Sequence, residues 1–314
     1  MAIRLIPRGN PKILYYAKVA FREMQPKAIC RLLLERQLAQ ASLYDATYLE
    51  DRLSYYNKLS GFPVLPKTVQ TAGRLDRTRS LYFYDLNRYA RYFDPKLKLS
   101  HLFGDITDVP EEPTIVKSRP INGNNVNSVL MKLDRNRHFY FPPDPLSFAS
   151  KKPMAVWRGT LNNDRRTTLV EGFSAHPRCD VGQVGGWKMG FAEKKFMRVK
   201  EQLQYRFILS VEGIDVATNL KWGMNSNSLC FSPKFRFETW FMEGRLKAGV
   251  HYVEVKDDFS DLEEKIDYYN YHVEEAGAII SNALSWVAQF KDERLEDLLS
   301  LMVLRRYFER TGQI

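Results

Sequence analysis

Strands and helices alternate along the second half of the chain, and this alternation restricts the fold more than any other feature. Apolar runs typical of buried strands occur at 154–157, 205–211, 228–231 and 250–255. Helical patterns lie between or after them, at 193–203, 218–225, 238–246 and from Ser260 onward. Such alternation is typical of a parallel sheet flanked by helices. The sequence therefore predicts the α/β class.

The end of the chain predicts two further helices. Ser260 followed by Glu263 is a capping-box pattern, and the apolar face after it recurs at steps of three and four as far as Val287. A final helix is predicted over 293–310, with basic residues near its end, where cations interact favourably with the helix dipole.

The first 150 residues predict helices at 26–41 and 45–59 and strands at 80–84 and 114–117. The segment PPDPLSFASKKP at 142–153 holds four prolines, and we interpret it as the junction between two domains.

Positive charge is concentrated toward the N-terminus. The net charge is +10 for residues 1–100, +6 for 101–200 and −6 for 201–314. A basic front predicts an anionic partner: nucleic acid, a membrane surface, or a phosphorylated glycan or nucleotide. The basic residues are scattered rather than clustered in a block and no nucleic-acid motif occurs, so we expect no nucleic acid.

No apolar run approaches the roughly eighteen residues of a membrane span, and the N-terminus lacks the pattern of a secretory signal. The three cysteines, Cys30, Cys179 and Cys230, lie far apart and match no metal spacing. These features predict a cytoplasmic protein.

Ligands of parallel α/β sheets bind at the carboxyl ends of strands, so loops that follow strands are the candidate sites. In FGDITDVPEEP, Asp105 and Asp108 lie three residues apart. One of these carboxylates could act as a general base, or the pair could bind a metal. An acidic turn that caps backbone N–H groups is the alternative interpretation.

Two further loops suit an anion. WRGTLNNDRR at 157–166 surrounds a glycine turn with Arg158, Thr160, Arg165 and Arg166, although a solvated loop would have the same composition. SVEGIDVATNLKWGMNSNS at 210–228 places Gly213 between a strand and a predicted helix, as an ordinary connection also would. Neither GxGxxG nor GxxxxGK[ST] occurs, and VGQVGGWKMG at 181–190 is interpreted as a flexible loop.

Together these loops resemble the CAP10-like glycosyltransferases, glycosyltransferase family 90. The resemblance covers about residues 80–290 and rests on WRGT with an arginine six residues after Thr160, on YRFILSVEGIDVATNLKW and on LKAGVHYVEVKDDFSDLEEKI, in that order. PTIVKSRPI, RNRHF and FETWFMEG are similar to bacterial, lipopolysaccharide-modifying members rather than to the eukaryotic protein O-glucosyltransferases.

The resemblance implies a GT-B fold: two Rossmann-like domains facing a cleft, with a C-terminal helix crossing back. Residues 1–150 would form the acceptor-side domain that carries the base, 151–290 the donor domain, and 291–314 the helix that packs back on the first domain. The implied reaction is an inverting, metal-independent transfer from a UDP-sugar, of glucose or xylose type, to a hydroxyl of a lipopolysaccharide or surface glycan. No cofactor is expected, and the basic front would contact the anionic inner face of the inner membrane.

The resemblance also implies roles for residues. The family's base is an Asp just before a proline, which matches Asp108 in TDVP, with Asp105 as second choice. The donor-binding hydroxyl matches Thr160, and the arginine after it matches Arg166, with Arg165 one residue away. The segment that lines the nucleotide follows Gly213 and comprises Ile214, Asp215, Val216, Ala217, Thr218 and Asn219.

One position departs from the family pattern. Asn219 stands where the eukaryotic members carry an arginine, so either Lys221 or the pair Arg158 and Arg166 would supply the charge for the diphosphate. Glu238 in FETW could accept ribose hydroxyls, as carboxylates often do in GT-B enzymes.

Two other functions remain open at this point. A non-catalytic basic module would bind nucleic acid or an anionic glycan with steep salt dependence. A metal-dependent transferase would use Asp105 and Asp108 as ligands and would lose activity with EDTA.

Overall fold

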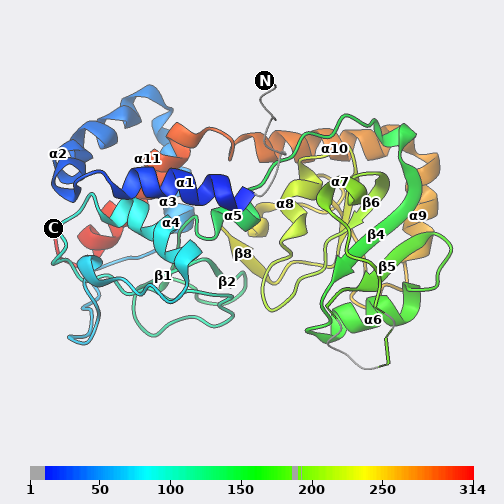
Figure 1. Ribbon diagram of the computed structural model, residues 1–314, viewed down its shortest axis with the longest axis horizontal. Coiled ribbons are helices and arrows are strands. Elements are labelled where there is room, and N and C mark those ends of the chain that lie inside the picture. The colour runs from blue at the N-terminus through cyan, green and yellow to red at the C-terminus, as the bar shows by residue number, and fades with distance from the viewer. Residues whose placement is uncertain (1–10, 186–189, 192) are drawn as a thin grey trace, which may run out of the picture.

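A sheet of five parallel strands forms the centre of the second half of the chain (Figure 1). The structure is a computed structural model and describes residues 11–185, 190–191 and 193–314. The strand order is β5–β4–β6–β7–β9. The strands are β4 (Lys152–Gly159), β5 (Cys179–Gln183), β6 (Tyr205–Leu209), β7 (Leu229–Ser232) and β9 (Val253–Glu254). The α/β class is therefore confirmed. Residues 186–189 of the predicted flexible loop lie outside the described residues.

Helices connect and cover these strands. They are α6 (Asp164–Phe173), α7 (Val199–Gln202), α8 (Asn219–Met224), α9 (Leu262–Tyr271) and α10 (Val273–Ala288). The predicted helix at 193–203 is reduced to α7. The long helix predicted from Ser260 begins later, at Leu262, and is divided at His272, so the predicted capping box is wrong. None of the described helices is long and apolar enough to cross a membrane.

The first half is mainly helical. Its helices are α1 (Pro11–Glu23), α2 (Lys27–Leu38), α3 (Ala46–Tyr56), α4 (Ser80–Ala90) and α5 (Arg135–His138), and its strands are β1 (Thr114–Val116), β2 (Ser118–Pro120) and β3 (Ser128–Leu130). The strand predicted at 80–84 is wrong. Buried Tyr82, Leu86 and Tyr89 recur at helical spacing. The five residues 80–84 alone fit the period of a strand as well as that of a helix.

Two segments of the second half complete the first half. β8 (Phe237–Thr239) pairs antiparallel with β2, in the register Arg119 to Glu238, so the helix predicted over 238–246 is wrong. The C-terminal helix α11 (Glu293–Arg310) runs back over the first half and packs against α2, α3 and α4 (Figure 1).

Both faces of the parallel sheet are buried, because successive side chains of each strand point to opposite faces. Val156 and Ile208 belong to a core that continues into the first half. Phe207 and Leu209 belong to a second core, which α9 and α10 cover with apolar residues. Among the described residues a parallel sheet of this size occurs once, and the predicted pair of Rossmann-like domains and its boundaries stay a prediction.

Candidate active site

A buried lysine joins two of the three loops that the sequence singled out. Lys117 follows β1, and its Nζ lies 2.5 Å from Asp105 Oδ1 and 2.6 Å from Asp215 Oδ2. Asp105 belongs to the acidic loop before β1, whereas Asp215 belongs to the loop after β6. Lys117 therefore brings the first half of the chain into contact with the carboxyl edge of the parallel sheet.

The charges around Lys117 stabilise one another. Burial lowers the pKa of Lys117, but the carboxylates of Asp215 and Asp105 outweigh this and raise the pKa above its ordinary value. Burial raises the pKa of Asp105, but Lys117 and Arg137 outweigh it and lower the pKa. Arg137 lies 3.5 Å from Asp105 and 2.8 Å from Asp134. Lys117 is therefore protonated and Asp105 ionised at neutral pH.

Arg166 ties the loop after β4 to the loop after β6. Its guanidinium donates hydrogen bonds to the carbonyl oxygens of Thr160, Val211 and Glu212 at 2.9–3.2 Å. Burial lowers the pKa of Arg166 to about 10, against the opposing effect of Asp215 and Asp105. A Cβ at Gly213 would lie 2.9 Å from Arg166 Nη2, so a larger residue there would displace the guanidinium from its present position.

The other two predicted arginines are paired with carboxylates. Arg165 lies 2.5 Å from Asp257 and 3.4 Å from Glu212. Arg158 lies 2.6 Å from Asp180 and also donates to the Asp180 carbonyl. The described hydrogen bonds of Arg166 go to carbonyl groups and no described carboxylate pairs with it directly, so its charge is the least neutralised of the three.

The predicted nucleotide segment curves around the end of β6. Gly213 N–H donates to the Asp215 carbonyl at 3.0 Å, which closes a tight turn. The Asn219 amide donates to the Leu209 carbonyl at 2.8 Å and so fixes the start of α8 against the strand. The other residues of the site differ in access: Thr160 and Ile214 are exposed, Thr218 is half-buried, and Val216 and Ala217 are buried.

Two predicted donor residues do not reach an open surface. Lys221 is fully buried, and its Nζ lies 2.7 Å from Glu243 Oε1, between the rings of Phe139 and Phe241. Glu238 is buried in the β2–β8 pair and is 2.7 Å from Arg119 Nε. Tertiary pairing therefore buries both side chains, so the structure gives no support to their predicted roles in donor binding.

The two candidate bases have different surroundings. Asp108 is exposed, and its carboxylate accepts a hydrogen bond from the Thr107 hydroxyl at 3.2 Å. Asp105 is held by Lys117 and Arg137. A base must approach a substrate hydroxyl and take its proton, and an ion-paired carboxylate with a lowered pKa is less suited to this than Asp108. The described residues include no group of three or more His, Cys, Asp or Glu side chains arranged for a metal ion.

Sequence reasoning missed the two cations that hold this site together. Lys117 ends the apolar run TIVK, and a lysine that continues a buried strand is the signal that could have found it. Arg137 lies in RNRHF, which carried the family resemblance without a role for this residue.

Comparison with known proteins identifies the family of this chain. The family model for glycosyl transferase family 90 matches residues 130–309, which include the whole parallel sheet and nearly all of α11. The O-glucosyltransferase LpsA of Dichelobacter nodosus is 48% identical over 304 residues, 95% of each chain. Uncharacterized protein 035R of Invertebrate iridescent virus 3 is 33% identical over 238 residues, which are 62% of this chain and 22% of the viral protein. The chain belongs to glycosyltransferase family 90.

Proposed function

We propose that this glycosyltransferase transfers a sugar from a UDP-sugar of glucose or xylose type to a hydroxyl of a lipopolysaccharide or related surface glycan, with inversion and without a metal. The family match and the bacterial relative, which is named as an O-glucosyltransferase, support glycosyl transfer. The observation that carries the site is the ion-paired contact of Asp105, Lys117 and Asp215, because it joins the acidic loop to the carboxyl edge of the sheet.

The proposed donor site lies along the loops after β4 and β6. The diphosphate would accept hydrogen bonds from those N–H groups of Arg166 that do not already donate to carbonyl oxygens. A guanidinium has more N–H donors than these carbonyl contacts use. The exposed Thr160 hydroxyl lies beside it in the same loop. A fixed cation of this kind stabilises the charge that develops on the departing UDP.

Asp108 is the proposed base. Its carboxylate takes the proton of the acceptor hydroxyl, whose oxygen forms a bond to the anomeric carbon while the bond from that carbon to UDP breaks. UDP leaves on the opposite face, so the configuration inverts. Asp105 holds the acidic loop in place through Lys117 and Arg137.

The proposed architecture is of GT-B type, with the acceptor bound by the first half. The return of α11 onto α3 and α4 supports it, because this helix ties the two halves together. The basic front of the chain supports contact with an anionic acceptor and an anionic membrane surface.

A UDP-release assay with UDP-glucose and UDP-xylose, with and without EDTA, tests the reaction. We expect release in both conditions. Asp108→Asn should lower turnover by about 10²-fold or more, while UDP still raises the melting temperature. Glu111→Gln, an exposed carboxylate three residues away in the same loop, is the matched control and should keep its activity.

Three results would contradict the proposal. Full turnover of Asp108→Asn would remove the base assignment. Loss of release with EDTA would favour a metal-dependent enzyme. Binding of polyanions without any effect of UDP would favour a non-catalytic module.

A further inference from the structure

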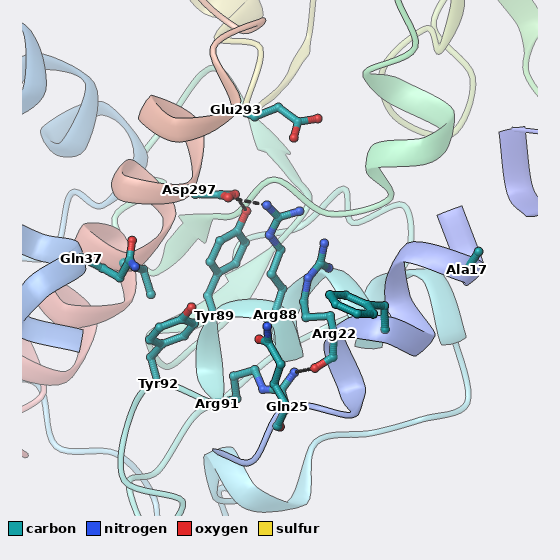
Figure 2. Close-up of a pocket in the computed structure, with 12 residues that line it drawn as sticks. Ala17, Arg22, Gln25, Gln37, Arg88, Tyr89, Arg91, Tyr92, Glu293 and Asp297 are labelled. Atoms are coloured by element: carbon teal, nitrogen blue, oxygen red, sulfur yellow. Dashed lines mark hydrogen bonds and ion pairs between the residues drawn. The ribbon is translucent and has the colours of Figure 1, made fainter. Parts of the chain in front are cut away.

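Two adjoining cavities lie in the first half, apart from the donor loops. One, of about 600 Å³, is bordered by α1, α4 and α11 (Figure 2). The other, of about 580 Å³, extends from the same helices toward α5 and the segment 139–141. Arg22, Arg88 and Glu293 line both cavities, so the two share part of their lining.

Basic side chains outnumber acidic ones along this space. The basic residues are Arg22, Arg88, Arg91, Lys132, Arg135 and Lys291, and the acidic ones are Asp85, Glu293 and Asp297. Several of these charges are already matched. Arg88 pairs with Asp297, Lys132 pairs with Glu296, and Asp85 accepts hydrogen bonds from the Tyr15 hydroxyl and the Arg135 backbone.

Arg22, which lines both cavities, has no such partner among the described residues. No described residue accepts a hydrogen bond from its guanidinium, although its backbone carbonyl accepts one from Arg91 at 2.6 Å. Its side chain is directed toward the same space as that of Arg88 (Figure 2). Burial and the neighbouring Arg88 lower the pKa of Arg22, so the fold holds this charge in an unfavourable place. An anion between Arg22 and Arg88 would relieve that repulsion.

The remaining lining residues suit a sugar better than a bare anion. Phe139, Tyr140 and Phe141 present aromatic surface in the second cavity, while Gln25 and Gln37 offer amide groups in the first. Apolar and aromatic walls with a few placed polar groups are typical of sites for small organic ligands. Lys291, which also lines the second cavity, lies over the Phe141 ring, with its Nζ 5.8 Å from the ring centroid.

One short helix connects this space to the candidate active site. Arg135, at the start of α5, lines the second cavity, and its guanidinium lies 3.2 Å from the Tyr89 hydroxyl. Arg137, two residues later, contacts Asp105 in the Lys117 cluster. A molecule bound in the cavities would therefore lie on the acceptor side of the proposed reaction.

We propose that the two cavities together bind an anionic saccharide, a phosphorylated or carboxylated sugar of the acceptor glycan, whose anionic group meets Arg22 and Arg88. The identification of this sugar as part of the acceptor rests on the proposed function. The binding itself rests on the cavities and their charges.

Isothermal titration of the full chain with glucose 6-phosphate tests the site, with glucose and inorganic phosphate as the two halves of the probe. We expect glucose 6-phosphate to bind at least about 10-fold more tightly than either half. Arg22→Gln should weaken this binding by about 10-fold or more, because a hydrogen-bonded charge is lost. The Arg22 guanidinium has no hydrogen-bond partner among the described residues and is repelled by Arg88, so the melting temperature of the variant should be no lower than that of the parent.

Two further variants separate the site from general electrostatics. Lys291→Gln should also weaken the binding of glucose 6-phosphate. Arg31→Gln removes an exposed arginine of α2 that lines neither cavity. The affinity of this variant for glucose 6-phosphate should equal that of the parent.

Equal affinity of the parent and Arg22→Gln would overturn the proposal. So would phosphate alone binding as tightly as glucose 6-phosphate, or vesicles of phosphatidylglycerol displacing the probe, since the ligand would then be a free anion or a lipid headgroup. UDP release by the same preparations is a separate measurement. Its absence beside intact glucose 6-phosphate binding would contradict the proposed function and still support the anionic site.

Discussion

Lys117 and Lys221 are both buried lysines with carboxylate partners, yet they lie in different kinds of place. Lys221 pairs with Glu243 within the second half and is enclosed by aromatic rings. Lys117 has two carboxylates, one from each half of the chain, and Asp105 keeps 30% of its side chain exposed. Sequence reasoning chose Lys221, and the structure directs attention to Lys117.

The two lysines also differ in the sign of their pKa shifts. For Lys221, burial outweighs its single partner Glu243 and lowers the pKa, whereas for Lys117 two carboxylates outweigh burial and raise it. A lysine that has one carboxylate partner in an apolar environment contributes to the packing of the core. A lysine shared between two halves controls how they meet, which is why we expect its loss to affect activity as well as stability.

The largest expected effect is that of Lys117→Met. Removing this cation leaves two buried or half-buried carboxylates facing each other, which should lower the free energy of unfolding by about 3–5 kcal/mol. Sugar transfer per folded molecule should also fall, because the acidic loop loses its attachment to the sheet edge. Denaturant unfolding and UDP release measure the two effects.

The matched control is the double variant Lys221→Met with Glu243→Gln. It removes the enclosed pair and keeps an acceptor oxygen for the Thr239 backbone N–H, which donates to Glu243 at 2.6 Å. Its stability should change by less than that of Lys117→Met, and its activity should not change. An equal loss of activity in both variants would show that the comparison is wrong.

A smaller effect is expected from the neighbouring arginines. Arg166→Lys should weaken the binding of UDP by about 10-fold, since a lysine cannot donate hydrogen bonds to three carbonyl groups and also to a phosphate. Arg165→Gln should leave UDP binding nearly unchanged, because Asp257 and Glu212 already neutralise Arg165. Titration of both variants with UDP measures these affinities. A larger loss of affinity in Arg165→Gln than in Arg166→Lys would assign the donor contact to Arg165.

The smallest effect is a pH dependence. The pKa of Lys221 lies below the ordinary 10.5, so the unfolded chain binds more protons between the lowered pKa and 10.5, and this group makes stability rise with pH there. The contribution of Lys117, whose pKa is raised, is complete below 10.5 and is lost only above it. As the pH rises toward 10.5, the stability difference between the parent and the Lys221→Met, Glu243→Gln variant should grow, by at most about 1.4 kcal/mol per pH unit.

The corresponding difference for Lys117→Met should stay constant over the same range. Urea unfolding at several pH values measures both. A growing difference for Lys117→Met would contradict the assigned direction of its pKa.

Much of the parallel sheet could be predicted from sequence, because β4, β6 and β7 are continuous apolar runs whose burial depends on local pattern. The helix α4 could not be predicted from its first residues, since SLYFY is rich in aromatic residues that strands also favour. The strand β8 depends on a partner more than a hundred residues earlier in the chain, which no local pattern contains.

The candidate site was predictable in part for the same reason. The loops around Arg166 and Gly213 follow strands and lie where the topology of parallel sheets places ligands. Whether a charged residue is enclosed or accessible depends on tertiary partners. Glu243 encloses Lys221, and Asp105 and Asp215 hold Lys117, so neither outcome could be derived from the spacing of residues.

The pairing of β2 with β8 has a consequence for biosynthesis. As the chain emerges from the ribosome, residues 118–120 appear more than a hundred residues before their partner, and α3 and α4 appear before α11 exists. The front half therefore waits with an unpaired strand edge and uncovered apolar helices, a state prone to aggregation. We expect the first half to complete its packing only after β8 and α11 have been synthesised.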